Sequence, residues 1–255
     1  MSDEAVLTEV RDAVLLVTLN RPEQRNAVNR AVAEGVAAAL DRLDADDALR
    51  AGVLTGAGKG FCAGMDLKAF VAGERPVVEG RGFAGIVRRP PAKPLIAAVE
   101  GFAVAGGFEI ALACDLIVAA HGARFGIPEV KRGLVAAGGA LLRLPQRIPY
   151  HLAMELALTG ELVDAERMAE VGLVSRLAEP GGAVDAALEL AAAIAANGPL
   201  ALAASKRILV EAPSWPADAA WERQAEISDP VRASADAREG SIAFAEKRAP
   251  RWTGR

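Results

Sequence analysis

Two glutamates of this chain stand beside breaks in the backbone, in stretches that are otherwise mostly apolar. Glu109 lies three residues after Gly106, and Glu129 lies directly after Pro128, twenty residues further on. Apolar surroundings raise the pKa of a carboxyl group toward values at which it can accept and donate protons near neutral pH. The pair therefore predicts general acid–base chemistry. Each glutamate alone has a simpler explanation, because Glu109 could complement a helix N-terminus and Glu129 could be a surface loop residue.

A glycine turn precedes Glu109 and follows a strand pattern. Residues 95–99 form a short apolar run, residues 101–107 are small and rich in glycine, and residues 109–113 are good helix formers. The expected order is strand, turn and helix. The glycine pair that ends the turn lets the backbone approach a ligand closely. The first amides of a helix have no internal partner, so they can stabilise a carbonyl oxygen that gains negative charge.

A second glycine loop repeats this order earlier in the chain. Residues 51–55 are predicted to form a strand, the loop from Gly56 to Gly64 holds four glycines, and Asp66 opens a helix. Two such turns can supply two backbone N–H donors to one oxygen. The sequence therefore predicts an oxyanion-binding site between two strand-to-helix turns.

Several longer motifs contain these residues. They are Leu19-Asn20-Arg21-Pro22 with Arg25-Asn26-Ala27, the run from Gly58 to Leu67, Gly106-Gly107-Phe108-Glu109, Phe125-Gly126-Ile127-Pro128-Glu129, and Phe244-Ala245-Glu246-Lys247-Arg248. In these motifs and their order the chain resembles the crotonase superfamily, which includes the enoyl-CoA hydratases and isomerases. The resemblance covers nearly the whole chain.

The resemblance implies a role for each residue of the predicted site. The backbone amides of Met65 and Gly106 would form the oxyanion hole for the carbonyl of an enoyl-CoA thioester. Glu109 would orient and deprotonate the water that adds at C3, Glu129 would deliver the proton at C2, and the roles would exchange in dehydration. The implied enzyme is an enoyl-CoA hydratase, a hydro-lyase of fatty acid and lipid metabolism. It needs no cofactor, because coenzyme A is part of the substrate.

The resemblance also implies which residues hold the CoA part of the substrate. They lie in the first two motifs and in the last one, and they are Arg25, Ala27, Ala63, Asp66, Leu67, Lys68 and Lys247. Arg25, Lys68 and Lys247 are candidates for phosphate recognition, and a solvated surface charge is the alternative for each. Lys247 is expected to reach a ligand held by a neighbouring subunit.

Two departures from the family pattern leave the substrate open. Ala136 stands where the family often has proline, and residues 140–143 replace a Gly-Thr-Gln-Arg-like run. The second departure makes the chain similar to the carnitinyl-CoA dehydratase branch, which uses the same paired carboxylates on a cationic acyl group. A double-bond isomerase is a further alternative, and a non-catalytic CoA-binding or RNA-binding relative belongs to a different class. The net charge of −4 and the intact glutamate pair weigh against that last class.

The expected fold class is α/β. Strands are predicted at 5–10, 13–19, 51–55, 95–99, 116–120 and 173–177. Helices are predicted at 30–44, 109–113, 140–144, 150–159, 165–171, 184–196, 200–211, 217–228 and from 229 or 230 to 246, with a short helix at 83–87 in a mobile segment that could line the acyl pocket. The resemblance implies a crotonase-like spiral core of ββα units over residues 1–197, which carries the CoA and catalytic site. Residues 198–255 would form an all-helical region that assembles a homotrimer or a dimer of trimers.

Other kinds of site find little support in the sequence. His121 and His151 lack the spacing of metal ligands, and Cys62 and Cys114 are expected to be small buried thiols rather than a disulfide. The acidic N-terminus lacks the basic and apolar regions of a signal peptide, and no window resembles a membrane span. The sequence therefore predicts a cytoplasmic protein that has no metal site, no membrane association and no nucleic-acid partner.

Overall fold

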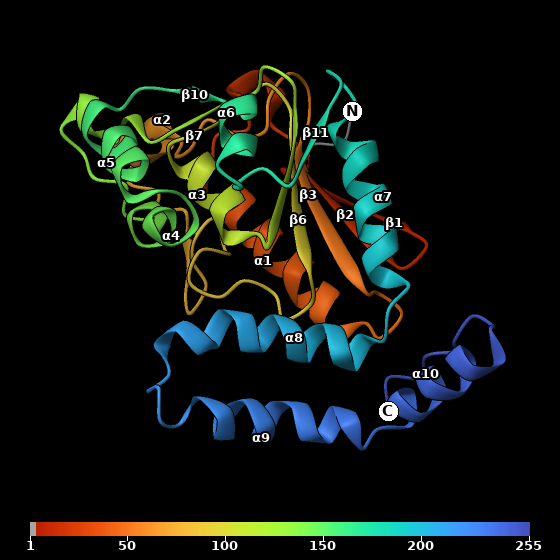
Figure 1. The fold of residues 1–255 in the computed structure, drawn as a ribbon. Coiled ribbons are helices and arrows are strands. Elements are labelled where there is room, and N and C mark those ends of the chain that lie inside the picture. Colours follow the sequence, from red (N-terminus) through yellow and green to blue (C-terminus); the bar gives the residue numbers. More distant parts are fainter. Residues whose placement is uncertain (1–3) are drawn as a thin grey trace.

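A six-stranded sheet forms the centre of the computed structural model, which describes residues 4–255 (Figure 1). The strands follow the order β1-β2-β3-β6-β8-β11, in which β1 and β2 pair antiparallel and all other neighbours pair parallel. Their bounds are β1 Val6–Arg11, β2 Val14–Leu19, β3 Ala51–Gly56, β6 Leu95–Val99, β8 Leu116–Ala120 and β11 Arg176–Ala178. Because β3 and β6 are parallel neighbours, the two glycine turns that follow them leave the sheet at the same edge.

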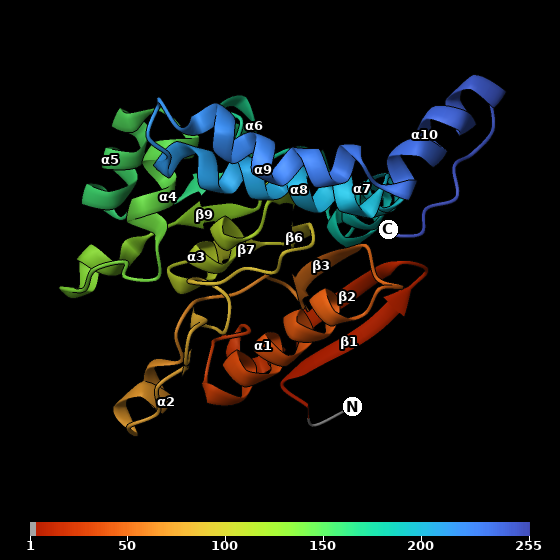
Figure 2. The ribbon, with the colours of Figure 1, turned by 90° about the horizontal axis from the view of Figure 1, so that it is seen from below.

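Helices cover both faces of this sheet (Figures 1 and 2). Their bounds are α1 Arg30–Ala45, α2 Leu67–Val71, α3 Gly106–Ala113, α4 Ala140–Arg147, α5 Tyr150–Thr159, α6 Ala165–Glu170, α7 Ala183–Ala195, α8 Pro199–Glu211, α9 Ala220–Arg232 and α10 Ala235–Glu246. Successive side chains of β2 point to opposite faces, so Leu16 packs with Ala187 of α7 while Leu15 packs in the larger core that contains Leu40 of α1. Burial on both faces explains why β2 is apolar throughout.

The caps of two helices confirm the starts predicted for them. Asn29 precedes α1, and its side chain accepts a hydrogen bond of 3.1 Å from the amide of Val32. Asp66 precedes α2, and its carboxylate accepts hydrogen bonds of 3.1 Å from the amides of Lys68 and Ala69. These bonds satisfy amides that have no partner inside the helix, which is why Asn and Asp mark helix starts in sequences.

A smaller sheet, which the sequence pattern did not predict, grows out of the turn after β6. It has the order β10-β9-β7, with bounds β7 Phe102–Val104, β9 Arg124–Gly126 and β10 Val163–Asp164. The expected turn at 101–107 therefore contains a strand. Strands of two or three residues are too short for an alternating pattern to be recognised. For a similar reason the strand predicted at 173–177 is displaced, because β11 begins only at Arg176.

The prediction of a short helix at 83–87 is wrong. This part of the chain forms a small hairpin of β4 (Val77–Val78) and β5 (Gly82–Phe83), followed by turns. Gly82, Ala84 and Gly85 have φ angles of +78°, +54° and +70°. Such angles lie outside the right-handed helical region, so the backbone cannot form a helix through them.

The prediction that one helix ends and the next begins at residue 229 or 230 is also wrong. α9 continues through Pro230 and ends at Arg232, and α10 begins after Ser234. The side chain of Ser234 accepts a hydrogen bond of 3.0 Å from the amide of Ala237. The cap at Ser234, and not the proline, therefore sets the boundary between the two helices.

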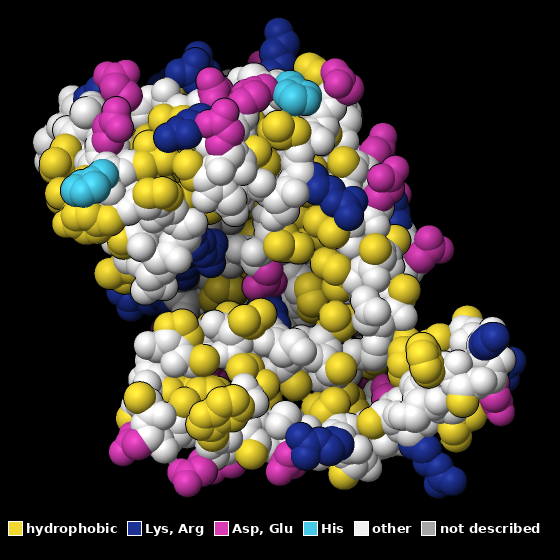
Figure 3. All heavy atoms as spheres, in the orientation of Figure 1, with side chains coloured by type: hydrophobic (Ala, Val, Ile, Leu, Met, Phe, Trp, Pro, Cys, Tyr) yellow, Lys and Arg dark blue, Asp and Glu magenta, His cyan; other side chains and the backbone are white. Residues whose placement is uncertain are grey.

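The C-terminal helices carry many exposed hydrophobic side chains. α8 and α9 lie side by side along one side of the core, and α10 extends away from it (Figures 1 and 2). Figure 3 shows hydrophobic side chains gathered on this part of the surface. Leu209, Trp221 and Phe244 are 76%, 78% and 87% exposed. Lys206 of α8 attaches the helix pair to the core through a 2.7 Å ion pair with Asp115.

Within residues 4–255, no single helix combines the length and hydropathy needed to cross a membrane. α7 together with residues Pro199–Ser214 reaches that length and composition, but the two parts are bent by 109° relative to each other.

Candidate active site

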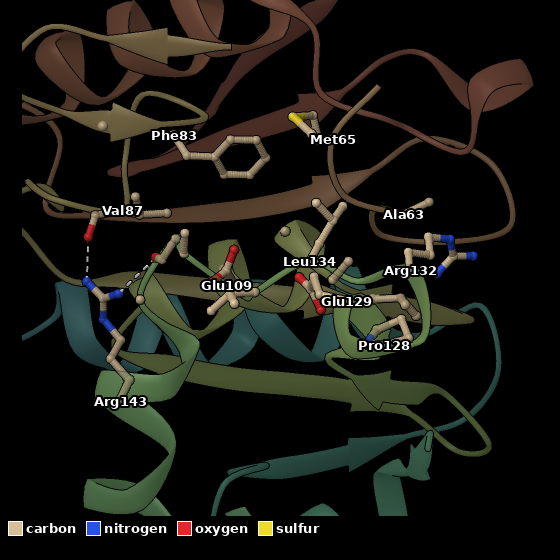
Figure 4. A pocket seen from close by; sticks show the side chains of 18 of the residues that line it. Ala63, Met65, Phe83, Val87, Glu109, Pro128, Glu129, Arg132, Leu134 and Arg143 are labelled. Atoms are coloured by element: carbon tan, nitrogen blue, oxygen red, sulfur yellow. Dashed lines mark hydrogen bonds between the residues drawn. The ribbon is translucent and has the colours of Figure 1, made fainter. Parts of the chain in front are cut away.

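One large cavity, with a volume of about 1230 Å³, contains both predicted glutamates. Figure 4 shows Glu109 and Glu129 close together in this cavity, with Phe83 and Met65 on the opposite wall. Glu109 comes from α3, and Glu129 comes from the 3₁₀ helix Pro128–Arg132. The topology thus brings together two carboxylates that are separated by the strands β8 and β9 in the sequence.

The two glycine turns touch each other beside this cavity. The amide of Val104 donates a 3.0 Å hydrogen bond to the carbonyl of Cys62. Gly64 has a φ of +93°, and a Cβ atom on it would lie 2.9 Å from the nitrogen of Gly106. A Cβ atom on Gly107 would lie 2.1 Å from the carbonyl oxygen of Cys62. Only glycine lets the two turns approach this closely.

The amides of Met65 and Gly106 are free in the described part of the chain. Gly106 is the first residue of α3, and Met65 follows the left-handed Gly64; both residues line the cavity. Among the hydrogen bonds of residues 4–255, none uses the amide of either residue as donor. Free amides beside a pair of carboxyl groups match the predicted oxyanion hole, and that assignment stays a prediction.

Glu109 is 4% exposed, and its carboxylate is held by the turn before α4. The amide of Ala140 donates a 3.2 Å hydrogen bond to Oε1, and a Cβ atom on Gly138 would lie 2.4 Å from Oε2. The pKa of Glu109 is raised to about 7, because burial and the nearby Glu129 outweigh the lowering by the amides of Ala140 and Gly138 and by Arg143. At neutral pH this carboxyl group is therefore close to its midpoint of titration.

Glu129 is only partly buried, but its Oε2 atom is enclosed. Within the described residues, Oε2 has no hydrogen-bond partner. Burial raises the pKa of Glu129 above its ordinary value, while Arg132 lowers it. A buried carboxylate oxygen without a protein partner is rare and is suited to bind water or substrate in the cavity.

Three of the seven residues predicted to hold CoA line the cavity, namely Arg25, Ala63 and Leu67. The amide of Ala63 donates a 3.0 Å hydrogen bond to the carbonyl of Arg25, which has a left-handed φ of 53°. The structure thus gathers the first two motifs at one end of the cavity.

The other four predicted CoA residues do not line the cavity in the described chain. Asp66 caps α2 and forms a 2.9 Å ion pair with Arg21, whose guanidinium also donates to the carbonyl of Ala27. These contacts give Asp66 and Ala27 a structural role. Lys68 is exposed on α2, and Lys247 is exposed directly after α10, a helix that projects on the side of the core away from α3 and α4 (Figure 1).

Arg143 and Phe83 belong to the site although the sequence motifs did not single them out. Arg143 donates hydrogen bonds of 2.5 Å to the carbonyl of Val87 and 3.4 Å to the carbonyl of Gly138 (Figure 4). The ring of Phe83 covers Gly106, since a Cβ atom there would lie 2.7 Å from it. A signal for Arg143 was present, because it is a lone charge in an apolar helical run after a glycine pair.

Thiol chemistry finds no support in this site. Cys62 and Cys114 are buried and free, as expected, and burial raises the pKa of the Cys62 thiol to about 12. Cys62 is therefore protonated at neutral pH. Among residues 4–255, no group of three or more His, Cys, Asp or Glu side chains is placed to hold a metal ion.

Comparison with known proteins identifies the family. The profile of the enoyl-CoA hydratase/isomerase family matches residues 9–255. The crystal structure of enoyl-CoA hydratase EchA1 from Mycobacterium marinum is 62% identical, with a TM-score of 0.98 over 99% of this chain and 100% of that chain. Enoyl-CoA hydratase EchA19 of Mycobacterium tuberculosis is 45% identical over 98% of this chain and 96% of its own length. The carnitinyl-CoA dehydratase of Proteus mirabilis is 38% identical over 100% of both chains.

The chain belongs to the enoyl-CoA hydratase/isomerase family. This result confirms the resemblance to the crotonase superfamily and the expected α/β fold with its helical C-terminal region. The protein is an enzyme of the enoyl-CoA hydratase-like lyase kind.

Proposed function

We propose that the protein catalyses the reversible addition of water across the 2,3 double bond of an enoyl-CoA thioester. One observation carries the proposal: two glutamates with raised pKa values share a cavity with two free backbone amides. A hydratase needs an acid, a base and a site for the negative charge that develops on the thioester oxygen.

We assign these tasks to particular groups. The thioester oxygen binds between the amides of Met65 and Gly106, where the enolate is stabilised without a metal ion. Glu109 takes a proton from the water that attacks C3, and Glu129 gives a proton to C2. In dehydration each carboxyl group plays the opposite part. The amide of Ala140 keeps the Glu109 carboxylate oriented throughout.

CoA would occupy the end of the cavity formed by Arg25, Ala63 and Leu67. Arg132 lies beside Ala63 at this end (Figure 4). Arginines suit the CoA phosphates because the guanidinium fork matches phosphate oxygens. Lys68 lies outside the cavity and would meet only the outer part of CoA. Lys247 could contribute only to a neighbouring subunit's ligand.

Carnitinyl-CoA dehydration is the second candidate, supported by the identity with the Proteus mirabilis enzyme over both full lengths. It would use the same glutamates on a cationic acyl group. An isomerase or a non-catalytic relative is less well supported, because neither needs both glutamates. The roles of residues 1–197 as the CoA-binding core and 198–255 as the trimerisation region, and the cytoplasmic location, stay predictions.

Hydration of crotonyl-CoA, followed as the loss of the enoyl absorbance, tests the proposal. We expect turnover without added metal or redox cofactor, and formation of the 3-hydroxyacyl-CoA by mass spectrometry. Conversion of a 3-enoyl-CoA to the 2-enoyl isomer, with no hydration, would instead identify an isomerase. Binding of CoA thioesters without any turnover would contradict an enzymatic role.

A further inference from the structure

The two ends of the cavity carry different side chains. Ala63 and Arg132 lie at one end, Val87 and Arg143 lie at the other, and the two glutamates lie between them (Figure 4). With CoA at the Ala63 end, the acyl chain of the substrate extends past the glutamates toward Val87. The residues around Val87 therefore meet the far end of the acyl group.

This acyl end is cationic. Arg88, Leu142, Arg143 and Gln146 line the cavity here. In the described chain, the two glutamates of the proposed mechanism are the cavity's only lining carboxylates. Within the described residues, both side-chain hydrogen bonds of Arg143 go to backbone carbonyls, which do not neutralise its positive charge.

Arg88 differs from the other two arginines of its segment. Arg81 and Arg89 both form ion pairs with Asp41 of α1, at a distance of 3.2 Å for Arg89. Within residues 4–255, the guanidinium of Arg88 has no ion pair and no side-chain hydrogen bond. Arg81 and Arg89 thus share one carboxylate partner, whereas Arg88, an exposed residue that lines the cavity, has none within the described residues.

The local backbone directs Arg88 toward the cavity. Its amide donates a 2.9 Å hydrogen bond to the carbonyl of Arg81. Its side-chain stem lies over Gly82, where a Cβ atom would approach the Arg88 Cγ atom to 2.7 Å. Gly82 also lines the cavity, and its φ of +78° favours glycine. The stem therefore packs along the wall, and Arg88 as a whole is an exposed residue that lines the cavity.

We propose that this end of the cavity selects enoyl-CoA thioesters whose acyl chain ends in a carboxylate, with the Arg88 guanidinium as its partner. A guanidinium binds a carboxylate through two parallel hydrogen bonds, which makes the pairing specific in geometry as well as favourable in energy. Arg143 adds positive charge at the same end. A trimethylammonium group, as in a carnitinyl substrate, would be repelled by both arginines. This inference rests on the proposed function, because the CoA end and the reacting double bond orient the acyl chain.

Three substrates with matched reacting groups test the selection. They are 2-hexenedioyl-CoA, which ends in a carboxylate, neutral 2-hexenoyl-CoA, and cationic 4-trimethylammonio-2-butenoyl-CoA. We expect kcat/KM for the diacid to exceed that for 2-hexenoyl-CoA by about tenfold, the scale of one charge-assisted hydrogen bond, with the cationic substrate slowest. Arg88→Gln should reduce the ratio of diacid to neutral substrate to about one. Arg89→Gln, a neighbouring exposed arginine outside the cavity, is the matched control and should leave the ratio unchanged.

Binding of saturated analogues separates this inference from the proposed reaction. The dissociation constants of adipoyl-CoA and hexanoyl-CoA, measured by calorimetry, require no turnover. We expect tighter binding of adipoyl-CoA in the parent protein and in Arg89→Gln, and no preference in Arg88→Gln. Loss of hydration with this binding preference intact would overturn only the proposed reaction. Equal affinities in the parent protein, or a cationic substrate as the best of the three, would overturn the selection itself.

Discussion

Glu109 and Glu129 are the same residue type in two different environments. Glu109 is buried and receives the amide of Ala140, whereas Glu129 is partly exposed and lies near Arg132. Burial raises both pKa values, and the nearby charge of Glu129 also raises the pKa of Glu109. Glu109 is close to its midpoint of titration near neutral pH, so a state with one proton on the pair is accessible there, and both directions of hydration require such a state.

This shared proton predicts how activity depends on pH. The pKa of Glu109 is raised to about 7, so above that pH the pair loses its last proton. We expect kcat/KM for crotonyl-CoA hydration to fall about tenfold per pH unit well above pH 7, and to fall again in acid where both groups are protonated. Dehydration must show the same profile, because the equilibrium constant ties the two directions together. A flat profile from pH 7 to 9 would contradict the assignment.

Removal of either carboxyl group should be costly. Glu109→Gln and Glu129→Gln should each lower the hydration rate by about 10²-fold or more, the scale of lost acid–base catalysis. The double variant should be hardly slower than the poorer single one, because groups that act together are not additive. Glu129→Gln should also abolish proton exchange at C2. Glu155→Gln, an exposed glutamate of α5, is the matched control. Full hydratase activity in Glu109→Gln would favour an isomerase-like site that rests on Glu129 alone.

At the scale of elements, the sequence predicted those whose causes are local. The apolar run of β2 and the caps Asn29 and Asp66 depend on neighbouring residues, and they were found within a residue or two. The strand β7 and the turns after Phe83 depend on contacts with distant parts of the chain. The same division holds for the site: the motifs located Glu109, but only the folded chain shows that the turn before α4 orients it.

The start of α3 allows a test of a backbone role. Gly106→Pro removes the amide at a helix position that tolerates proline, so the fold should persist while activity falls by about 10²–10³-fold, the scale of one lost oxyanion donor. A Cβ atom alone would strike the ring of Phe83. Gly106→Ala keeps the amide but introduces the clash with Phe83. The activity that this variant loses should return when it is combined with Phe83→Leu. Met65→Ala should retain most activity, because its amide remains. Recovery of Gly106→Pro by Phe83→Leu would show that only the clash mattered.

Arg143 joins two segments of the site and acts as a positioning residue. It connects Val87 in the segment that covers Gly106 to Gly138 in the turn that holds Glu109. Its charge also lowers the pKa of Glu109, and the other charged group near that carboxylate is Glu129. Both effects depend on one side chain of α4, so they can be separated by substitution.

Arg143→Met should therefore lower kcat and move the alkaline limb of the pH profile to higher pH, because the positive charge that favours the Glu109 carboxylate is lost. Arg143→Lys keeps the positive charge but loses the two-pronged guanidinium that bonds to both carbonyls. This variant should lower kcat without moving the alkaline limb of the pH profile. Arg147 bonds to the carbonyl of Leu112 from the same helix and lies outside the cavity lining, which makes Arg147→Met the control. If the alkaline limb of the pH profile does not move in Arg143→Met, the charge of Arg143 does not act on Glu109 and the residue has only a packing role.

At the scale of the molecule, the C-terminal helices are incomplete as a monomer surface. α8 and α9 have no fully buried side chain, and α10 projects from the core (Figures 1 and 3). Leu209 and Trp221 are more than three-quarters exposed. Exposed apolar area of this kind is favourably buried against other copies of the chain. An assembly would also give Lys247 a place near a neighbour's ligand, which its own cavity does not offer.

We therefore expect a trimer or hexamer, with a mass in solution of three or six times the 26.4 kDa of one chain. Light scattering at micromolar concentration measures this directly. The double variant Leu209→Glu with Trp221→Glu should shift the protein toward monomers, because charges would have to be buried in the interface. Glu222→Gln, beside Trp221 on the same helix, should assemble normally.

Lys247→Ala should raise KM for CoA thioesters in the assembled protein but not in the monomeric variant, since its effect requires a second subunit. A light-scattering mass of one chain for the parent protein would contradict the prediction that these helices bind other copies of the chain.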